Sequence, residues 1–150
     1  MRTPLRHAAL FGALALACVP AWAEVHEVKM LNRGASGAMV YEPEYLVVAP
    51  GDSVKFIASH STHNAASIPG FHPEGAATFK GRINEEIEVT LEQPGFYGIQ
   101  CIPHYAMGMV MLIQVGEPGL DQLAVPAGLP NRAAERFARI VEQAKAATGI

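Results

Sequence analysis

The stretch Cys101-Ile-Pro-His104-Tyr-Ala-Met-Gly-Met109 brings a thiol, an imidazole and a thioether close together in the chain. It lies between two apolar runs, Phe96–Cys101 and Met109–Val115, that are typical of β-strands, so it forms a strand end and the loop that follows. Pro103 stiffens such a loop, and Gly108 permits the turn that brings Met109 toward Cys101. Sulfur and nitrogen donors together suit a soft metal ion, above all copper. The stretch therefore predicts a metal site carried by two strands and their connection.

Short strands separated by turn residues precede this loop. The run Glu86–Leu91 is the clearest, because apolar and polar side chains alternate along it and would face opposite sides of a sheet. The other expected strands are Val25–Leu31, which Asn32-Arg-Gly34 and Ser36-Gly37 should break, Tyr45–Ala49 and Ser53–Ser59. Turns such as Pro50-Gly51-Asp52 and Gln93-Pro-Gly95 separate them. Regular short strands of this kind predict a mainly β fold, a β-sandwich.

The C-terminal part of the chain has a different pattern. After Leu120–Leu123 and two prolines, apolar residues recur at helical spacing from an Asn131 cap to about Ala147, with charged residues on the other side. The charges are mixed and do not form the basic face of a membrane-surface helix. We expect this helix to pack on an open face or edge of the sandwich.

The first 23 residues predict a secretory signal. A basic start with Arg2 and Arg6 precedes an apolar stretch and then Ala21-Trp-Ala23, which has small residues where a signal peptidase reads. Cleavage after Ala23 leaves one domain, 24–150, with the sandwich over about 24–116 and the helical tail over about 119–148. The net charge of the whole chain is −3 and becomes more negative without the signal, which argues against a nucleic-acid partner. We expect no membrane span after the signal.

Cleavage also removes Cys18, so Cys101 becomes the single cysteine of the mature chain and has no disulfide partner. Two histidines, one cysteine and a weak axial methionine are the ligands of a blue-copper electron-transfer site. The second histidine must come from another strand, and His63 is the candidate, with His60 as its competitor. The alternation of side chains along a strand does not show which of Met107, Met109 and Met111 is the methionine ligand, because all three would lie on the same face. Asn64 is expected to hydrogen-bond to the Cys101 loop.

Several motifs together resemble the pseudoazurins, a branch of the type 1 copper proteins of the cupredoxin group. The matching stretches are Gly37-Ala-Met-Val40, Glu42-Pro43, Pro50-Gly51-Asp52, His63-Asn64, Pro73-Glu-Gly75, Gln93-Pro-Gly95 and Cys101 through Met109. The resemblance implies a Greek-key β-sandwich with two C-terminal α-helices. It also implies that one copper ion is held by His63, Cys101, His104 and Met109.

The resemblance further implies a periplasmic one-electron carrier that serves a nitrite reductase, and c-type cytochromes are the other expected partners. We expect a monomer, because a carrier must bind and release its partners, and we expect no enzyme activity, because protein donors fill all four ligand positions. Electrons would leave through His104 across a docking patch of Met39, Pro103, Ala106 and Met107. The chain has only four lysines, whereas related carriers use lysines to attract acidic partners, so we expect weak electrostatic steering. The alternative function is a copper-binding or delivery module without a redox role.

Overall fold

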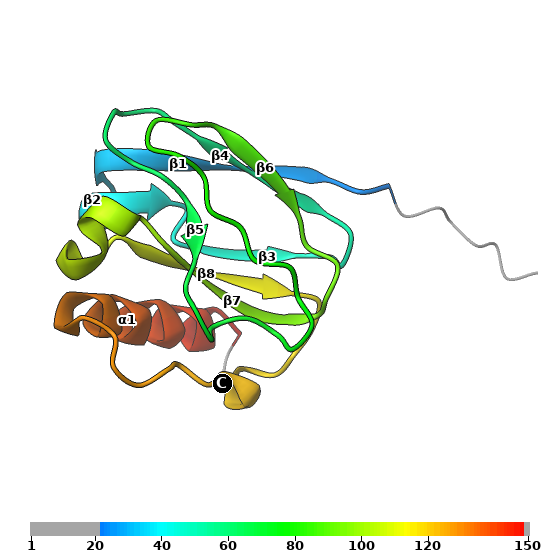
Figure 1. Ribbon diagram of the computed structural model, residues 1–150. Coiled ribbons are helices and arrows are strands. Elements are labelled where there is room, and N and C mark those ends of the chain that lie inside the picture. Colours follow the sequence, from blue (N-terminus) through cyan, green and yellow to red (C-terminus); the bar gives the residue numbers. More distant parts are fainter. Residues whose placement is uncertain (1–21, 149–150) are drawn as a thin grey trace, which may run out of the picture.

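Two four-stranded sheets form the body of the protein in a computed structural model that describes residues 22–148 (Figure 1). The first sheet has the order β2 (Gly37–Glu42), β1 (Val25–Gly34), β4 (Ser53–Ile57), β6 (Ile87–Thr90). The second has the order β3 (Tyr45–Val48), β8 (Val110–Val115), β7 (Gly95–Gln100), β5 (Ala66–Ser67). The β1/β4 and β3/β8 pairs are parallel and the others antiparallel. The predicted β-sandwich is confirmed.

The main core lies between the two sheets and follows from strand alternation. Along β6, Ile87 and Val89 are half-buried while Glu88 and Thr90 are exposed, as the sequence pattern predicts. The two sheets bury their inner faces against each other, and this removal of apolar surface from water is the main stabilising contribution. The largest fully buried side chains of this core are Tyr41, Phe56, Met30, Ile99, Met109, Met111 and Ile113.

The N-terminal hairpin differs from the sequence prediction. Asn32-Arg-Gly34 does not break the first strand, because β1 continues to Gly34 and turns directly into β2, a strand that the alternation did not predict. Gly34 pairs with Gly37 across the turn, and Gly37 has a φ of +126°, which only glycine adopts easily. The glycines therefore make a tight hairpin here.

The C-terminal segment contains one long helix, α1 (Asn131–Thr148), and a single 3₁₀ turn, η2 (Leu120–Gln122). The sequence resemblance implied two α-helices, and the structure has one α-helix preceded by the short turn η2. The prolines at 126 and 130 and Gly128 prevent η2 from continuing as an α-helix. Figure 1 shows α1 below the second sheet. Ala133, Phe137 and Ile140 are buried in one cluster with Val110 and Leu112 of β8, which confirms that the helix packs on the sandwich.

Within residues 22–148, no helix is both long and apolar enough to cross a bilayer. The predicted signal falls almost entirely outside the described residues. Of that segment the structure describes only Trp22 and Ala23, which are exposed and precede β1.

Candidate metal centre

The loop after β7 is a compact pair of 3₁₀ turns, η1 (Ile102–Met107), with Pro103 in its first turn. It lies at one end of the sandwich, beside β2 and the first turns of α1 (Figure 1). Gly108 ends it with a φ of +86°, and a Cβ there would lie 2.7 Å from the carbonyl oxygen of Arg132. Glycine is required both by this left-handed conformation and by the close approach of α1. The predicted roles of Pro103 and Gly108 in shaping the loop are consistent with this geometry.

Three donor atoms converge at this end of the molecule. Nδ1 of His63 lies 3.1 Å from Nδ1 of His104, and the Sγ of Cys101 lies 3.4 Å from His104 Nδ1 and 3.7 Å from His63 Nδ1. Cys101 and His63 are fully buried, and His104 is half-buried. This is the only group of three or more metal-binding side chains among residues 22–148. His63 is thus brought to the loop from a segment that is distant in sequence.

The ring of His63 is oriented by a side chain that sequence reasoning missed. Its Nε2–H donates to Oδ1 of Asn32, 2.7 Å away, so Nδ1 carries the lone pair that faces Cys101. Burial, assisted by His104 and His60, lowers the pKa of His63 to about 4, so the ring is neutral at physiological pH. His60 itself is exposed and accepts a hydrogen bond from the backbone N–H of Asn32. The structure therefore brings His63, and not His60, to the cluster.

Asn64 links the His63 segment to the donor loop. Its Oδ1 accepts a hydrogen bond from the backbone N–H of Ile102 at 2.8 Å, and its Nδ2 donates to the carbonyl of Gly81 at 2.9 Å. The side chain is buried, so neither bond competes with water. The predicted hydrogen bond from Asn64 to the loop is present in this geometry.

The thiol of Cys101 is in a mainly apolar environment. Burial raises the pKa of Cys101, opposed by hydrogen bonds from the backbone N–H groups of Asn64 and His104. A positive ion at the site is what such a thiol needs in order to be a thiolate at neutral pH. The cluster therefore favours metal binding over a free reactive thiol.

The methionines that alternation did not separate are separated by the structure. Met109 is fully buried, and its carbonyl accepts a hydrogen bond at 3.0 Å from the N–H of Cys101, directly across the strand pair. Met111 is in β8 and pairs with Ile99, in the core between the sheets. Met107 is 43% exposed on η1. The backbone of Met109 hydrogen-bonds to both Cys101 and His104, which places this buried methionine beside the donor cluster.

The donor set fits copper. Three donors arranged trigonally around a first-row metal, with bonds of about 2.0–2.3 Å, lie roughly 3.5–3.8 Å apart. The observed separations of 3.1, 3.4 and 3.7 Å are close to this range. A thiolate with two imidazoles and a nearby thioether is the ligand chemistry of a blue-copper site.

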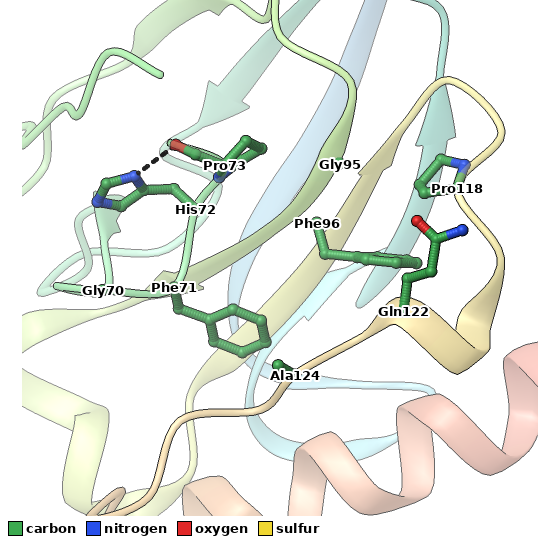
Figure 2. Close-up of a pocket in the computed structure, with 9 residues that line it drawn as sticks. All are labelled: Gly70, Phe71, His72, Pro73, Gly95, Phe96, Pro118, Gln122 and Ala124. Carbon is green, nitrogen blue, oxygen red and sulfur yellow. Dashed lines mark hydrogen bonds between the residues drawn. The ribbon is translucent and has the colours of Figure 1, made fainter. Parts of the chain in front are cut away.

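The cavity drawn in Figure 2 does not suggest a competing substrate site. It has a volume of about 280 Å³ and is lined mainly by apolar and glycine residues that include Phe71 and Phe96. Its only titratable side chain is His72, whose Nδ1 hydrogen-bonds to the adjacent carbonyl of Pro73. This cavity therefore offers no convergent polar groups of the kind that bind a substrate.

Comparisons with known proteins agree with the fold and with copper binding. Residues 28–116 match the family described as copper binding proteins, plastocyanin/azurin family. The chain belongs to this family of copper-binding proteins, with a cupredoxin fold.

Within the family, the chain is similar to pseudoazurins at 43–45% identity. The chain is 45% identical to pseudoazurin from Paracoccus pantotrophus over 131 residues, which cover 87% of this chain and 90% of that protein. Pseudoazurin from Methylorubrum extorquens is 43% identical over 70% of this chain and 72% of its own length. The crystal structure of pseudoazurin from Methylobacterium extorquens AM1 superposes with a TM-score of 0.73 at 36% identity, covering 79% of this chain and 98% of that one.

The structure of a pseudoazurin from Sinorhizobium meliltoi gives a TM-score of 0.68 at 45% identity, over 76% of this chain and 92% of that one. The chain is therefore a pseudoazurin-type copper protein, an electron-transfer cupredoxin and not an enzyme.

Proposed function

We propose that this protein is a periplasmic one-electron carrier whose single type 1 copper is held by His63, Cys101, His104 and Met109. The convergence of three soft and borderline donor atoms within 3.7 Å of one another, in a buried site closed by protein, carries the proposal. Bound copper supplies a one-electron couple between Cu(II) and Cu(I). The chain holds the donors in one arrangement: Asn32 fixes the His63 ring, and Asn64 ties the two donor segments together.

His104 is the proposed exit for the electron. Its Nδ1 faces the cluster, so the opposite edge of the half-buried ring points away from it. Pro103, Ala106 and Met107 around it are exposed, and Met39 is half-buried. Ile102, which the sequence did not single out, is 43% exposed and adds to this apolar surface. A small apolar patch suits the weak, short-lived docking of an electron carrier.

The proposed partner is a nitrite reductase or a c-type cytochrome, and the proposed route to it is secretion with cleavage after Ala23. The pseudoazurin relatives support a redox partner. The low lysine count supports a partner that is not strongly acidic, or one recognised mainly through the apolar patch. We expect electron transfer to an acidic nitrite reductase to be slow and only mildly salt-dependent, and stopped-flow rates over a range of salt concentrations measure this.

The copper proposal is tested by the visible spectrum of the oxidised, copper-loaded protein and of Cys101→Ser. We expect an intense thiolate-to-copper band that ascorbate bleaches and that the substitution abolishes. His72→Gln is a matched control at a histidine outside the cluster and should leave the band unchanged. A colourless protein that binds copper weakly would contradict the proposal.

The alternative, a copper-delivery module, is distinguished by the rate of metal loss. A closed site with four protein donors should hold copper against a weak chelator, whereas a delivery module should lose it within minutes. Fast loss from a protein with a normal blue band would favour delivery.

A further inference from the structure

We propose that the processed N-terminus, Glu24-Val25-His26, is a second metal site that chelates one divalent copper or nickel ion. The proposal rests on the cleavage after Ala23 proposed above, because it needs the free amine of Glu24. It does not depend on the copper centre at the other end of the sandwich.

The chemistry follows from the position of His26, two residues after the new amine. The amine nitrogen, the amide nitrogens of Val25 and His26, and the imidazole Nδ1 close a series of fused chelate rings in one plane. Four nitrogens in a square plane suit Cu(II) and Ni(II). On binding, the ammonium group and the two amides each release one proton to water. The imidazole binds through its lone pair, and no electron is transferred.

The structure gathers the two ends of this chelate on one carboxylate. The backbone nitrogen of Glu24 donates to Oδ1 of Asp52 at 2.9 Å, and Nε2 of His26 lies 3.0 Å from Oδ2 of the same residue. Nδ1 of His26, the nitrogen that the chelate requires, has no hydrogen-bond partner within residues 22–148. A metal-bound amine keeps two N–H protons and a metal-bound imidazole keeps its Nε2–H. Both bonds to Asp52 therefore use protons that chelation keeps, and the bond at Nε2 leaves Nδ1 available to a metal.

The segment is also accessible. Glu24 is exposed, Val25 is 51% exposed, and β2 pairs with β1 only from Lys29 onward. A cavity of about 570 Å³ lies beside Glu24, His26 and Asp52.

Chelation has one structural requirement. Val25 and His26 pair with Ser53 and Val54 of β4 and must leave this register for their amides to bind a metal. Because this end of β1 is paired on one side only, we expect local opening without unfolding of the sandwich.

The test uses the mature Cu(I)-loaded protein, with its first residue verified by mass spectrometry, and Ni(II) as the probe. Copper in the first site keeps nickel out of it. We expect one equivalent of Ni(II) to form a yellow, diamagnetic, square-planar complex. His26→Gln removes one nitrogen, and Val25→Pro removes an amide proton at a strand start that tolerates proline. Both should abolish the complex, and the matched control His72→Gln should retain it.

Three results would overturn the proposal: a mature protein that begins elsewhere than Glu24, a paramagnetic complex or none, or binding retained by both variants. Cys101→Ser separates the two metal proposals. If it loses the blue band and still binds Ni(II) at the N-terminus, both proposals stand. If the wild-type protein has no blue band and Cys101→Ser still forms the nickel complex, the copper proposal fails. Only the N-terminal site would then stand.

Discussion

His63 and His26 lie near opposite ends of the sandwich, and each has its Nε2 on a side-chain oxygen. The partner of His63 is the neutral amide of Asn32 at 2.7 Å, and that of His26 is the carboxylate of Asp52 at 3.0 Å. Both oxygens accept a hydrogen bond and can orient a ring, but only the carboxylate carries a charge. The same hydrogen-bond geometry is therefore made with a neutral partner at one end of the sandwich and with a charged partner at the other.

The two histidine rings also differ in burial and in the charge of the groups around them. His63 is fully buried beside the apolar core, and its pKa is lowered to about 4, so it is a neutral ligand. Asp52 has its pKa lowered, first by the hydrogen bond from the backbone of Glu24 and then by His26. The end of the sandwich that contains His63 therefore presents a neutral histidine to a metal. The end that contains His26 holds the carboxylate of Asp52 in its charged form.

The largest effect is expected from Asn64→Leu, which removes the side chain that links the His63 segment to the donor loop. This change leaves the partly buried N–H of Ile102 and the buried carbonyl of Gly81 without partners, at a cost of about 1–3 kcal/mol each. We expect the free energy of unfolding to fall by about 3 kcal/mol in chemical denaturation. The control Gln143→Leu, at an exposed amide side chain of α1, should change it by less than about 0.5 kcal/mol. A loss at Asn64 no larger than the control would mean that this link does not hold the donor loop.

An intermediate effect is expected from changing the partner of His63. Asn32→Ala removes the acceptor that orients the ring, and we expect copper affinity to fall by about 10–100-fold in competition titrations. Asn32→Asp keeps an acceptor and adds a charge, making this end resemble the Asp52 end. It should restore most of the affinity and lower the reduction potential, because the carboxylate stabilises the more positive oxidised centre. Equal loss in both variants would show that orientation is not the role of Asn32.

The smallest effect is expected at the opposite end, from Asp52→Asn. The change weakens the contacts to Glu24 and His26, and we expect a loss of about 1 kcal/mol at pH 7. Because the folded state lowers the pKa of Asp52, its stabilisation is complete above the unfolded pKa of about 3.9 and is lost as pH falls through the folded value. Denaturation of both proteins as a function of pH measures this. The difference should shrink below about pH 4, and a constant difference would contradict an electrostatic role.

The local sequence pattern predicts those features of the structure that depend on residues close together in the chain. The alternation in Glu86–Leu91 predicted β6, and the close spacing of Cys101, His104 and Met109 predicted a donor loop. The hairpin at Gly34 and Gly37 was misread because glycine marks both breaks and tight turns, and only strand pairing decides between them.

Contacts between distant segments were out of reach of local pattern. Asn32 and His63 are 31 residues apart, and no spacing rule connects them. The resemblance to pseudoazurins favoured His63 over His60, and the burial of one ring and exposure of the other agree with it. The pairing of His26 with Asp52 likewise depends on the parallel register of β1 and β4.

The parallel pairing of β3 with β8 has a consequence for how the protein becomes functional. It joins Tyr45 to Leu112, so the chain must close a long loop before the second sheet is complete. Such non-local pairing slows folding relative to proteins dominated by local contacts. Since β7 and β8 are neighbours in the chain, we expect the segment with Cys101, His104 and Met109 to form earlier, and His63 to join it when the sandwich closes. Copper can therefore bind to the full set of donors only late in folding. A chain that binds copper before the sandwich closes would hold it without His63.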